Sequence, residues 1–323
     1  MINRQKARRR PKRDRNVHYI ASLMTARVER SVSPRNSGRS WSLVRIYDGV
    51  PKMLRSIQTL KGSAVAALDG LLGSVDEVYF DDEAWGVRYL VIDTGNWLNE
   101  RQVLISPYSV KHTDPGAGAV SVDLTRDQVR DSPSINTQQP VSRQHEVKYL
   151  RYYGYPMYWG GRDSWGIGGF PVLGPMQVAP GIESEAFEPI ELAVDGAPPV
   201  DVHLRSTDAV TGYHIEARDG SIGHVSGFIF DDVAWVIRYL TVDTRNWWPG
   251  GKTVLLATQW VGSVDWLGST ISTGLTRGSI RSCPDYDDSV PLSRTYEAAL
   301  HTFHGKDGYW AKGDTSLPRQ DVS

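Results

Sequence analysis

The sequence predicts a mainly β protein with short helices, built as two tandem small β-barrels that are each followed by a helical tail. Three observations predict this fold: a long internal repeat, segments rich in β-branched and aromatic residues inside each repeat, and helix-capping patterns after those segments. At about 150 residues per domain, a chain of 323 residues has the length for two such units.

The internal repeat is the strongest of these signals. Residues 73–98 align without a gap with residues 223–248, and 14 of the 26 aligned positions are identical. Upstream, Leu54-Arg55-Ser56 corresponds to 204–206, and downstream Tyr158-Trp159 corresponds to 309–310. Each repeat therefore covers about a hundred residues and includes more than the barrel itself.

Within the first repeat, residues 75–80 and 85–94 have the composition of strands, and the polar residues 81–84 between them suit a hairpin loop. Apolar residues occur on both faces of the second strand, so we expect it to be covered on both sides. The outer face is predicted to carry the apolar positions Leu90, Ile92, Leu240 and Val242. These positions would allow the two repeats to pack as a pseudo-twofold pair; the alternative is that each helical tail covers this face of its own barrel.

Two helix signals follow the first barrel. Thr125 and Gln128 have the spacing of a capping box, which predicts a short helix that ends near Pro133. Ser142 is expected to cap a second helix over 143–153, which ends before Gly154.

The predicted organisation is a basic segment (1–52), barrel 1 (53–133), helical tail 1 (134–160), a Gly/Pro-rich linker (161–202), barrel 2 (203–284), helical tail 2 (285–310) and a disordered C-terminal tail (311–323). The segment 1–52 holds 14 Lys and Arg residues against three acidic residues, a net charge of +11. Its composition is typical of disorder. Three interpretations remain open: an arm for nucleic acid or anionic lipid, a targeting peptide, or a stretch that is not native because the protein starts at Met53.

Composition excludes several classes of protein. The formal net charge of the whole chain is −1, so a generally basic nucleic-acid binder is not indicated. The single cysteine, Cys283, rules out an internal disulfide framework and a multi-cysteine metal site. No segment has the run of about 18 apolar residues that a spanning helix needs, so a soluble protein is expected. We find no nucleophile motif and no phosphate-binding loop, and therefore expect no enzyme, no catalytic residues, no cofactor and no metal.

The segment FDDEAWGVRYLVIDTGNWL at 80–98, followed by VLISP at 103–107, resembles PRC-barrel proteins, and the tail at 124–161 resembles the tail of the same family. The family includes the cytoplasmic part of the photosynthetic reaction-centre H subunit and the C-terminal domain of a ribosome-maturation factor. The resemblance covers both repeats and carries no catalytic signature. It implies a bacterial protein-interaction, adaptor or assembly module, with a link to a photosynthetic complex by resemblance only. The spanning helix of the H subunit and the N-terminal RNA-binding domain of the maturation factor have no counterpart in this sequence.

Three groups of polar residues are candidates for chemistry, and for each a structural role is favoured. The carboxylates at 81–83 could hold a hard cation but suit a turn. Arg88 and Asp93 recur in the second repeat, yet they face opposite sides of a strand and must pair with other groups. His301 and His304, with Asp307 beyond them, have metal-like spacing but lack a placed third ligand.

Tryptophans at loop tips are the candidate partner-contact residues: Trp97, Trp247 and Trp248. Contact with a partner and packing on the chain's own barrel are weighed equally for them. We therefore expect a protein partner, with intramolecular pairing of the barrels as a further expectation. The alternative is an RNA- or ribosome-associated factor that uses the basic N-terminal arm. The expected location is cytoplasmic, peripheral to a membrane only through a partner.

Overall fold

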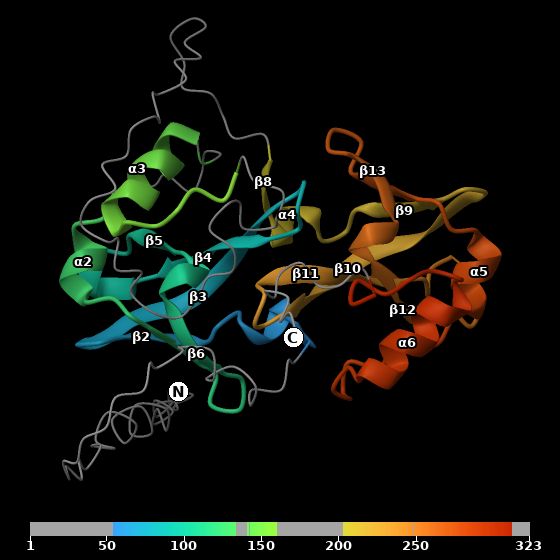
Figure 1. Cartoon of the computed structure of the whole chain (residues 1–323), viewed down its shortest axis with the longest axis horizontal. Helices are drawn as coiled ribbons and strands as arrows, with labels where there is room; N and C mark the ends of the chain where they lie inside the picture. The colour runs from blue at the N-terminus through green and yellow to red at the C-terminus, as the bar shows by residue number, and fades with distance from the viewer. Residues whose placement is uncertain (1–53, 134–140, 142, 160–202, 248, 312–323) are drawn as a thin grey trace, which may run out of the picture. The chain divides into compact units, whose positions relative to one another are not determined.

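The computed structural model describes residues 54–133, 141, 143–159, 203–247 and 249–311. The predictions for the basic segment 1–52, the linker 161–202 and residues 312–323 lie outside this part of the chain. All described residues belong to one compact unit (Figure 1).

The first sheet has seven strands, of which six come from the first repeat. Their spatial order is β5 (Gln102–Ile105), β4 (Val87–Asp93), β3 (Gly70–Asp81), β2 (Ala64–Ala67), β7 (Ala119–Val122) and β6 (Val110–Asp114). The β2–β7 pair is parallel and the other neighbours are antiparallel. The seventh strand, β8 (Leu204–Ser206), pairs with β3 and belongs to the second repeat.

The second sheet repeats this arrangement. Its order is β12 (Thr253–Ala257), β11 (Val236–Asp243), β10 (Gly220–Asp231), β9 (His214–Ala217), β14 (Thr270–Thr273) and β13 (Val261–Asp265), with β1 (Leu54–Ser56) paired to β10. The prediction of a mainly β protein with few short helices is confirmed. Within the described ranges no strand pairing closes either sheet, so the two units are barrel-like rather than closed.

Each repeat thus gives its first strand to the sheet of the other repeat, which the sequence did not reveal. The two exchanged strands have equivalent registers: Arg55 lies opposite Phe230, and Arg205 lies opposite Phe80. The rings of Phe80 and Phe228 also meet across the junction, with centroids 5.8 Å apart. The predicted intramolecular pairing therefore occurs through strand exchange.

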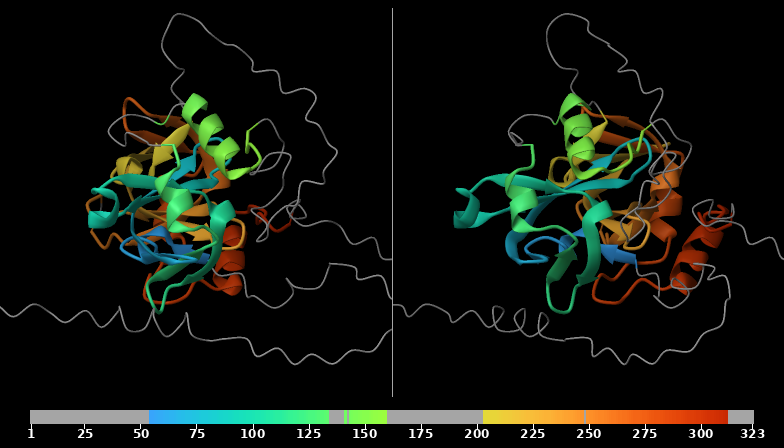
Figure 2. Two further views of the ribbon diagram at one scale, coloured as in Figure 1. Left: turned by 90° about the vertical axis from the view of Figure 1, so that its left-hand side faces the viewer. Right: turned by 60° about the vertical axis from the view of Figure 1, so that its left-hand side comes forward.

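Short helices complete each unit: η1 (Ile57–Thr59), η2 (Gly95–Leu98), η3 (Pro107–Ser109), α2 (Arg126–Arg130) and α3 (Arg143–Tyr153), then α4 (Thr207–Val210), η5 (Thr258–Trp260), α5 (Arg277–Ser282) and α6 (Arg294–Phe303). The predicted capping box is present, since the side chains of Thr125 and Gln128 each bond the other's backbone N–H. The predicted helix over 143–153 is α3, while Ser142 lies outside the described residues. Figure 2 shows α3 lying along the first sheet.

The outward face predicted for β4 is wrong. Leu90 and Ile92 are fully buried in the main hydrophobic cluster, together with core residues of both sheets. Tyr89 and Val91, on the opposite face of the strand, pack against α3. The pairing of β4 with β3 has a register irregularity at Tyr79/Phe80, opposite Tyr89 and Val87. Val87 therefore shares the main cluster with Leu90 and Ile92, and a strict alternation from residue 85 does not hold. The helical tail therefore covers the outer face.

Candidate functional site

The loop between β3 and β4 meets its counterpart between β10 and β11 at the centre of the molecule. Gly86 and Val236, which occupy the same position in the two repeats, form an antiparallel bridge. Two equivalent hydrogen bonds flank it, Val87 N–H to Trp235 O and Ile237 N–H to Trp85 O, both 2.8 Å. Residues 85 and 235 both adopt positive φ angles, 56° and 52°. An approximate two-fold axis relating the repeats therefore passes close to this bridge.

The first carboxylate of each loop organises its own turn. Asp81 Oδ1 accepts hydrogen bonds from the backbone N–H groups of Glu83 (2.8 Å) and Ala84 (2.9 Å). Its Oδ2 pairs with the buried Arg88 at 3.2 Å. Asp231 and Arg238 repeat this arrangement in the second loop. The role of Asp81 is structural, and it explains why the arginine of β4 recurs in both repeats.

The second carboxylate of each loop reaches the exchanged strand. Asp82 Oδ2 accepts from Arg205 Nε at 2.8 Å, and Asp232 Oδ2 pairs with Arg55 Nη2 at 2.9 Å. Both aspartate side chains are less than 10% exposed, so water screens these pairs weakly. Each pair joins residues of different repeats and holds an exchanged strand in place.

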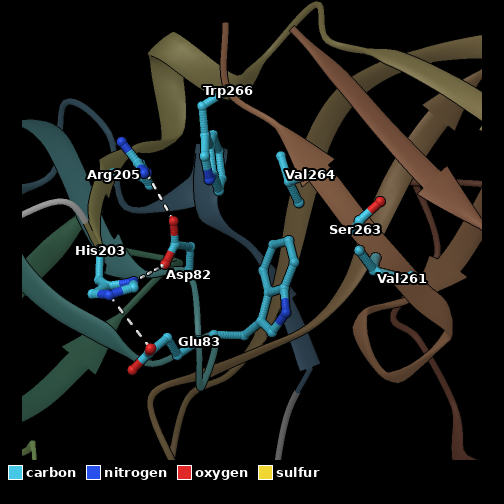
Figure 3. Close-up of a pocket in the computed structure, with 10 residues that line it drawn as sticks. Asp82, Glu83, His203, Arg205, Val261, Ser263, Val264 and Trp266 are labelled. Atoms are coloured by element: carbon cyan, nitrogen blue, oxygen red, sulfur yellow. Dashed lines mark hydrogen bonds and ion pairs between the residues drawn. The ribbon is translucent and has the colours of Figure 1, made fainter. Parts of the chain in front are cut away.

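Each exchanged strand meets the sheet of the other repeat at a junction: β8 with β3, and β1 with β10. A groove of about 520 Å³ opens beside the β8 junction (Figure 3). Its lining comes from the β3–β4 loop, from the start of β8 and from β13: Asp82, Glu83, Trp85, His203, Arg205, Val261, Gly262, Ser263, Val264 and Trp266. His203 contacts Asp82 at 2.9 Å through Nδ1 and Glu83 at 3.4 Å through Nε2. The guanidinium of Arg205 lies 4.1 Å from the ring centroid of Trp266.

The two junctions differ at the residues that line this groove. At the other junction Arg55 donates a hydrogen bond to Thr113 Oγ1 of β6 at 3.0 Å, which ties the exchanged strand to the neighbouring edge strand. The equivalent of Thr113 is Val264, which cannot accept that bond. Val233 stands in place of Glu83, and Pro115 in place of Trp266. One junction therefore carries charged and aromatic groups that the other lacks.

The chemistry of the groove suits recognition. The Glu83 side chain is 69% exposed and that of His203 is 40% exposed, whereas Asp82 is buried beneath them. The hydroxyl of Ser263 is engaged with Ser272 Oγ at 2.8 Å. Exposed charge around tryptophan and valine surfaces resembles the composition of protein interfaces, where aromatic residues act as anchors inside a polar rim.

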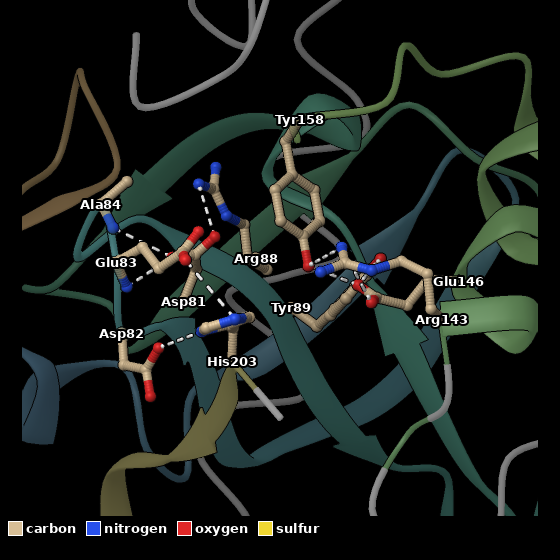
Figure 4. A network of polar contacts seen from close by, with 10 residues as sticks. All are labelled: Asp81, Asp82, Glu83, Ala84, Arg88, Tyr89, Arg143, Glu146, Tyr158 and His203. Atoms are coloured by element: carbon tan, nitrogen blue, oxygen red, sulfur yellow. Dashed lines mark hydrogen bonds and ion pairs between the residues drawn. The ribbon is translucent and has the colours of Figure 1, made fainter. Parts of the chain in front are cut away.

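A buried polar network fastens the first helical tail to its sheet (Figure 4). Glu146 of α3 is fully buried and accepts hydrogen bonds from Tyr89 of β4 (2.9 Å) and Tyr158 of the tail (2.6 Å). Arg143 pairs with the other carboxylate oxygen at 3.5 Å, and Arg88 stacks on the ring of Tyr158 at 3.9 Å. These groups satisfy a charge that would otherwise be costly to bury.

The second repeat contains the same network. Glu297 accepts from Tyr239 (2.9 Å) and Tyr309 (3.0 Å), and it pairs with Arg294 at 2.9 Å. Burial raises the pKa of the Glu297 carboxyl, and these three groups oppose that rise. Because the same network occurs in both repeats, we infer that its role is to attach each helical tail to its sheet.

The tip tryptophans contact their own repeats. Trp97 is partly buried, donates from Nε1 to Leu72 O, and lies 4.4 Å beneath the Arg126 guanidinium. Trp247 lies beside His214 and His224. Trp248 lies outside the described residues. Partner contact at these positions stays a prediction.

The paired histidines of α6 serve packing and hydrogen bonding. His301 bonds Tyr239 Oη and Asp307 O, both at 3.0 Å, and burial lowers its pKa. His304 contacts Ser279 Oγ at 3.1 Å. Among the described residues, no group of three or more His, Cys, Asp or Glu is placed to hold a metal ion. Burial raises the pKa of the Cys283 thiol to about 11, which makes it a poor nucleophile at neutral pH.

Comparison with models of protein families gives a match in the first repeat. A family model for the PRC-barrel domain matches residues 54–129, which cover the barrel part of the first repeat. Residues 54–129 are therefore similar to PRC-barrel domains, in agreement with the sequence resemblance. No curated protein matches the chain. Among the described residues no helix is long and apolar enough to cross a membrane.

The groove was missed in the sequence because its residues lie far apart in the chain. The sequence offers Asp82 and Glu83 only as a possible cation site or as a turn, and neither His203 nor Trp266 belongs to a motif. Strand exchange brings residue 203 beside residue 82, and the turn after β13 supplies residue 266. One signal was available: Glu83 and Trp266 are positions at which the two repeats differ in charge or aromatic character.

Proposed function

We propose that the chain is a non-enzymatic protein-interaction module, an adaptor or assembly factor built from two PRC-type units. The family match of the first repeat supports this proposal. The second repeat has the same strand order as the first, including the parallel pair and the exchanged strand, which supports extending the family assignment to it.

The observation that carries the proposal is the groove at the β8 junction. Its charged and aromatic residues lie at a junction whose counterpart holds Val233 and Pro115 instead. Groups that serve only to join the repeats would be expected at both junctions. We therefore assign Glu83, His203 and Trp266 to contact with a protein partner. By resemblance to the reaction-centre H subunit, a membrane-associated complex is the first partner class to test, with the module on its cytoplasmic side.

The test is affinity capture from the native host with the full chain as bait, followed by mass spectrometry. Trp266→Ala removes an aromatic anchor of the groove, and Phe303→Ala is the matched control at an exposed aromatic residue of α6 outside it. A protein captured by the wild type and by Phe303→Ala, but lost with Trp266→Ala, supports the proposal. Equal loss with both variants, or equal retention, contradicts the assignment to the groove. Thermal melting of both variants checks that each is folded.

The RNA-associated alternative predicts a different result from the same capture. Binding through the basic segment 1–52 would release nucleic acid on nuclease treatment and would weaken steeply as salt rises, because phosphate contacts release counterions. A partner that survives both treatments and deletion of residues 1–52 favours the protein-interaction module.

A further inference from the structure

Two histidines of the second sheet lie directly opposite each other on neighbouring strands. His214 of β9 is the register partner of His224 of β10. The backbone N–H of Val225 donates to Tyr213 O at 2.8 Å, which makes the histidine pair a non-hydrogen-bonded pair. In such pairs the two Cα atoms approach to about 4.5 Å and the side chains stand close together on one face of the sheet.

The pair is accessible to solvent and lies beside an indole ring. His214 is exposed and His224 is partly exposed, so both imidazoles can be reached from solvent. The ring of Trp247 lies 6.1 Å from His214 and 5.9 Å from His224, which places both imidazoles beside one indole. On the far side of His224 its register partner is Asp243 of β11, whose carboxylate is held by Arg245.

The first repeat shows that the fold does not need these histidines. The equivalent register pair there is Ala64 and Ser74, while the tryptophan and the aspartate are retained as Trp97 and Asp93. Only in the second repeat are both residues of this cross-strand pair histidines. A packing role would not require histidine at both positions of a solvent-accessible cross-strand pair.

We propose that His214 and His224 form a surface site for one divalent transition-metal ion. Neutral imidazole nitrogens are preferred ligands of Zn²⁺, Ni²⁺ and Cu²⁺, whereas Mg²⁺ and Ca²⁺ prefer oxygen. The pair supplies two protein ligands, and water fills the remaining positions. The site is independent of the groove and of the proposed partner.

The experiment is calorimetric titration of the metal-stripped full chain with Ni²⁺ and, separately, Zn²⁺. We expect one saturable equivalent, lost or weakened at least tenfold in His214→Ala and in His224→Ala. His112→Ala removes an exposed histidine of β6 in the first repeat and is expected to bind as the wild type does. Mg²⁺ is expected to give no saturable heat.

A gain-of-site variant tests the geometry directly. Ala64→His combined with Ser74→His places the same pair in the first repeat, and we expect a second equivalent of bound metal. Thermal melting with and without Ni²⁺ gives an independent readout, since a ligand that binds the folded state raises the melting temperature. Absence of saturable binding to the wild type, or wild-type affinity in both His214→Ala and His224→Ala, would overturn the proposal.

Discussion

Adjacent identical residues perform different tasks at the centre of this molecule. Asp81 bonds the backbone of its own turn and the arginine of β4, whereas Asp82 reaches Arg205 of the other repeat. Both carboxylates are buried, and both depend on partners that were not adjacent in sequence. A turn at this position could be predicted from composition, but the inter-repeat contact could not.

Replacement of Asp82 by Asn should destabilise the protein. The variant weakens the charge-assisted bond to Arg205 and the contact with His203 while keeping the shape of the side chain. Loss of a partner from a buried charged hydrogen bond costs about 1–3 kcal/mol. Asp127→Asn, which disrupts the exposed pair of α2 with Arg130, should leave the urea midpoint almost unchanged. Equal midpoints for the two variants would contradict the assigned role of Asp82.

The buried network of the first tail gives a larger expected effect. Glu146→Ala leaves Tyr89 and Arg143 without their shared acceptor, and removing one partner from a buried charged group costs about 3 kcal/mol. Urea unfolding measures the change. Lys148→Ala, at an exposed position of the same helix, is the control and should have little effect. An unchanged midpoint for Glu146→Ala would show that the tail does not depend on this carboxylate.

At the scale of elements, the exchanged strands explain what the sequence could and could not predict. The hairpin of β3 and β4, the capping box of α2 and the bounds of α3 follow from local patterns, and all are present. The exchange could not be predicted because β1 and β8 have the same sequence, Leu-Arg-Ser, so either strand can complete either sheet. The groove depends on that exchange, so it could not be predicted from the sequence either.

The junction of β8 carries a titratable group that its counterpart lacks. Glu77 of β3 accepts a hydrogen bond from Ser206, and Lys61 pairs with Asp208 beside it. Burial, followed by the nearby charge of Asp208, raises the pKa of Glu77 to about 7 from its ordinary value of 4.5, and Asp76 adds to the rise while Lys61 opposes it. The equivalent position in the second repeat is Gly227.

Stability should therefore fall as pH rises from about 4.5 to about 7. Between these two pH values the folded state keeps the proton on Glu77, whereas the unfolded chain has lost it. The contribution of Glu77 to the free energy of unfolding is therefore complete below about pH 4.5 and lost above about pH 7. Glu77→Gln should flatten this part of the profile of urea midpoint against pH. An identical slope in the variant and the wild type would assign the pH dependence to other groups.

At the scale of the whole molecule, strand exchange joins the two repeats into one folded unit. One hydrophobic cluster contains buried residues of both sheets, and each sheet is completed by a strand of the other repeat. Pairing of the repeats could be predicted from the internal symmetry, but the surface expected for it was wrong because β4 turns Leu90 and Ile92 into the core. Unfolding should therefore be a single transition, with both sheets lost together.

The most direct test of strand exchange is a double-mutant cycle on Arg55 of β1 and its aspartate partner. The exchanged arrangement pairs Arg55 with Asp232, at 2.9 Å, although these residues are 177 positions apart. Alanine substitutions at these two positions, measured by urea unfolding, should show a coupling energy of about 1 kcal/mol, while Arg55 and Asp82 should show none. Coupling between Arg55 and Asp82 instead, with none between Arg55 and Asp232, would mean that each strand stays in its own repeat, and would contradict the account.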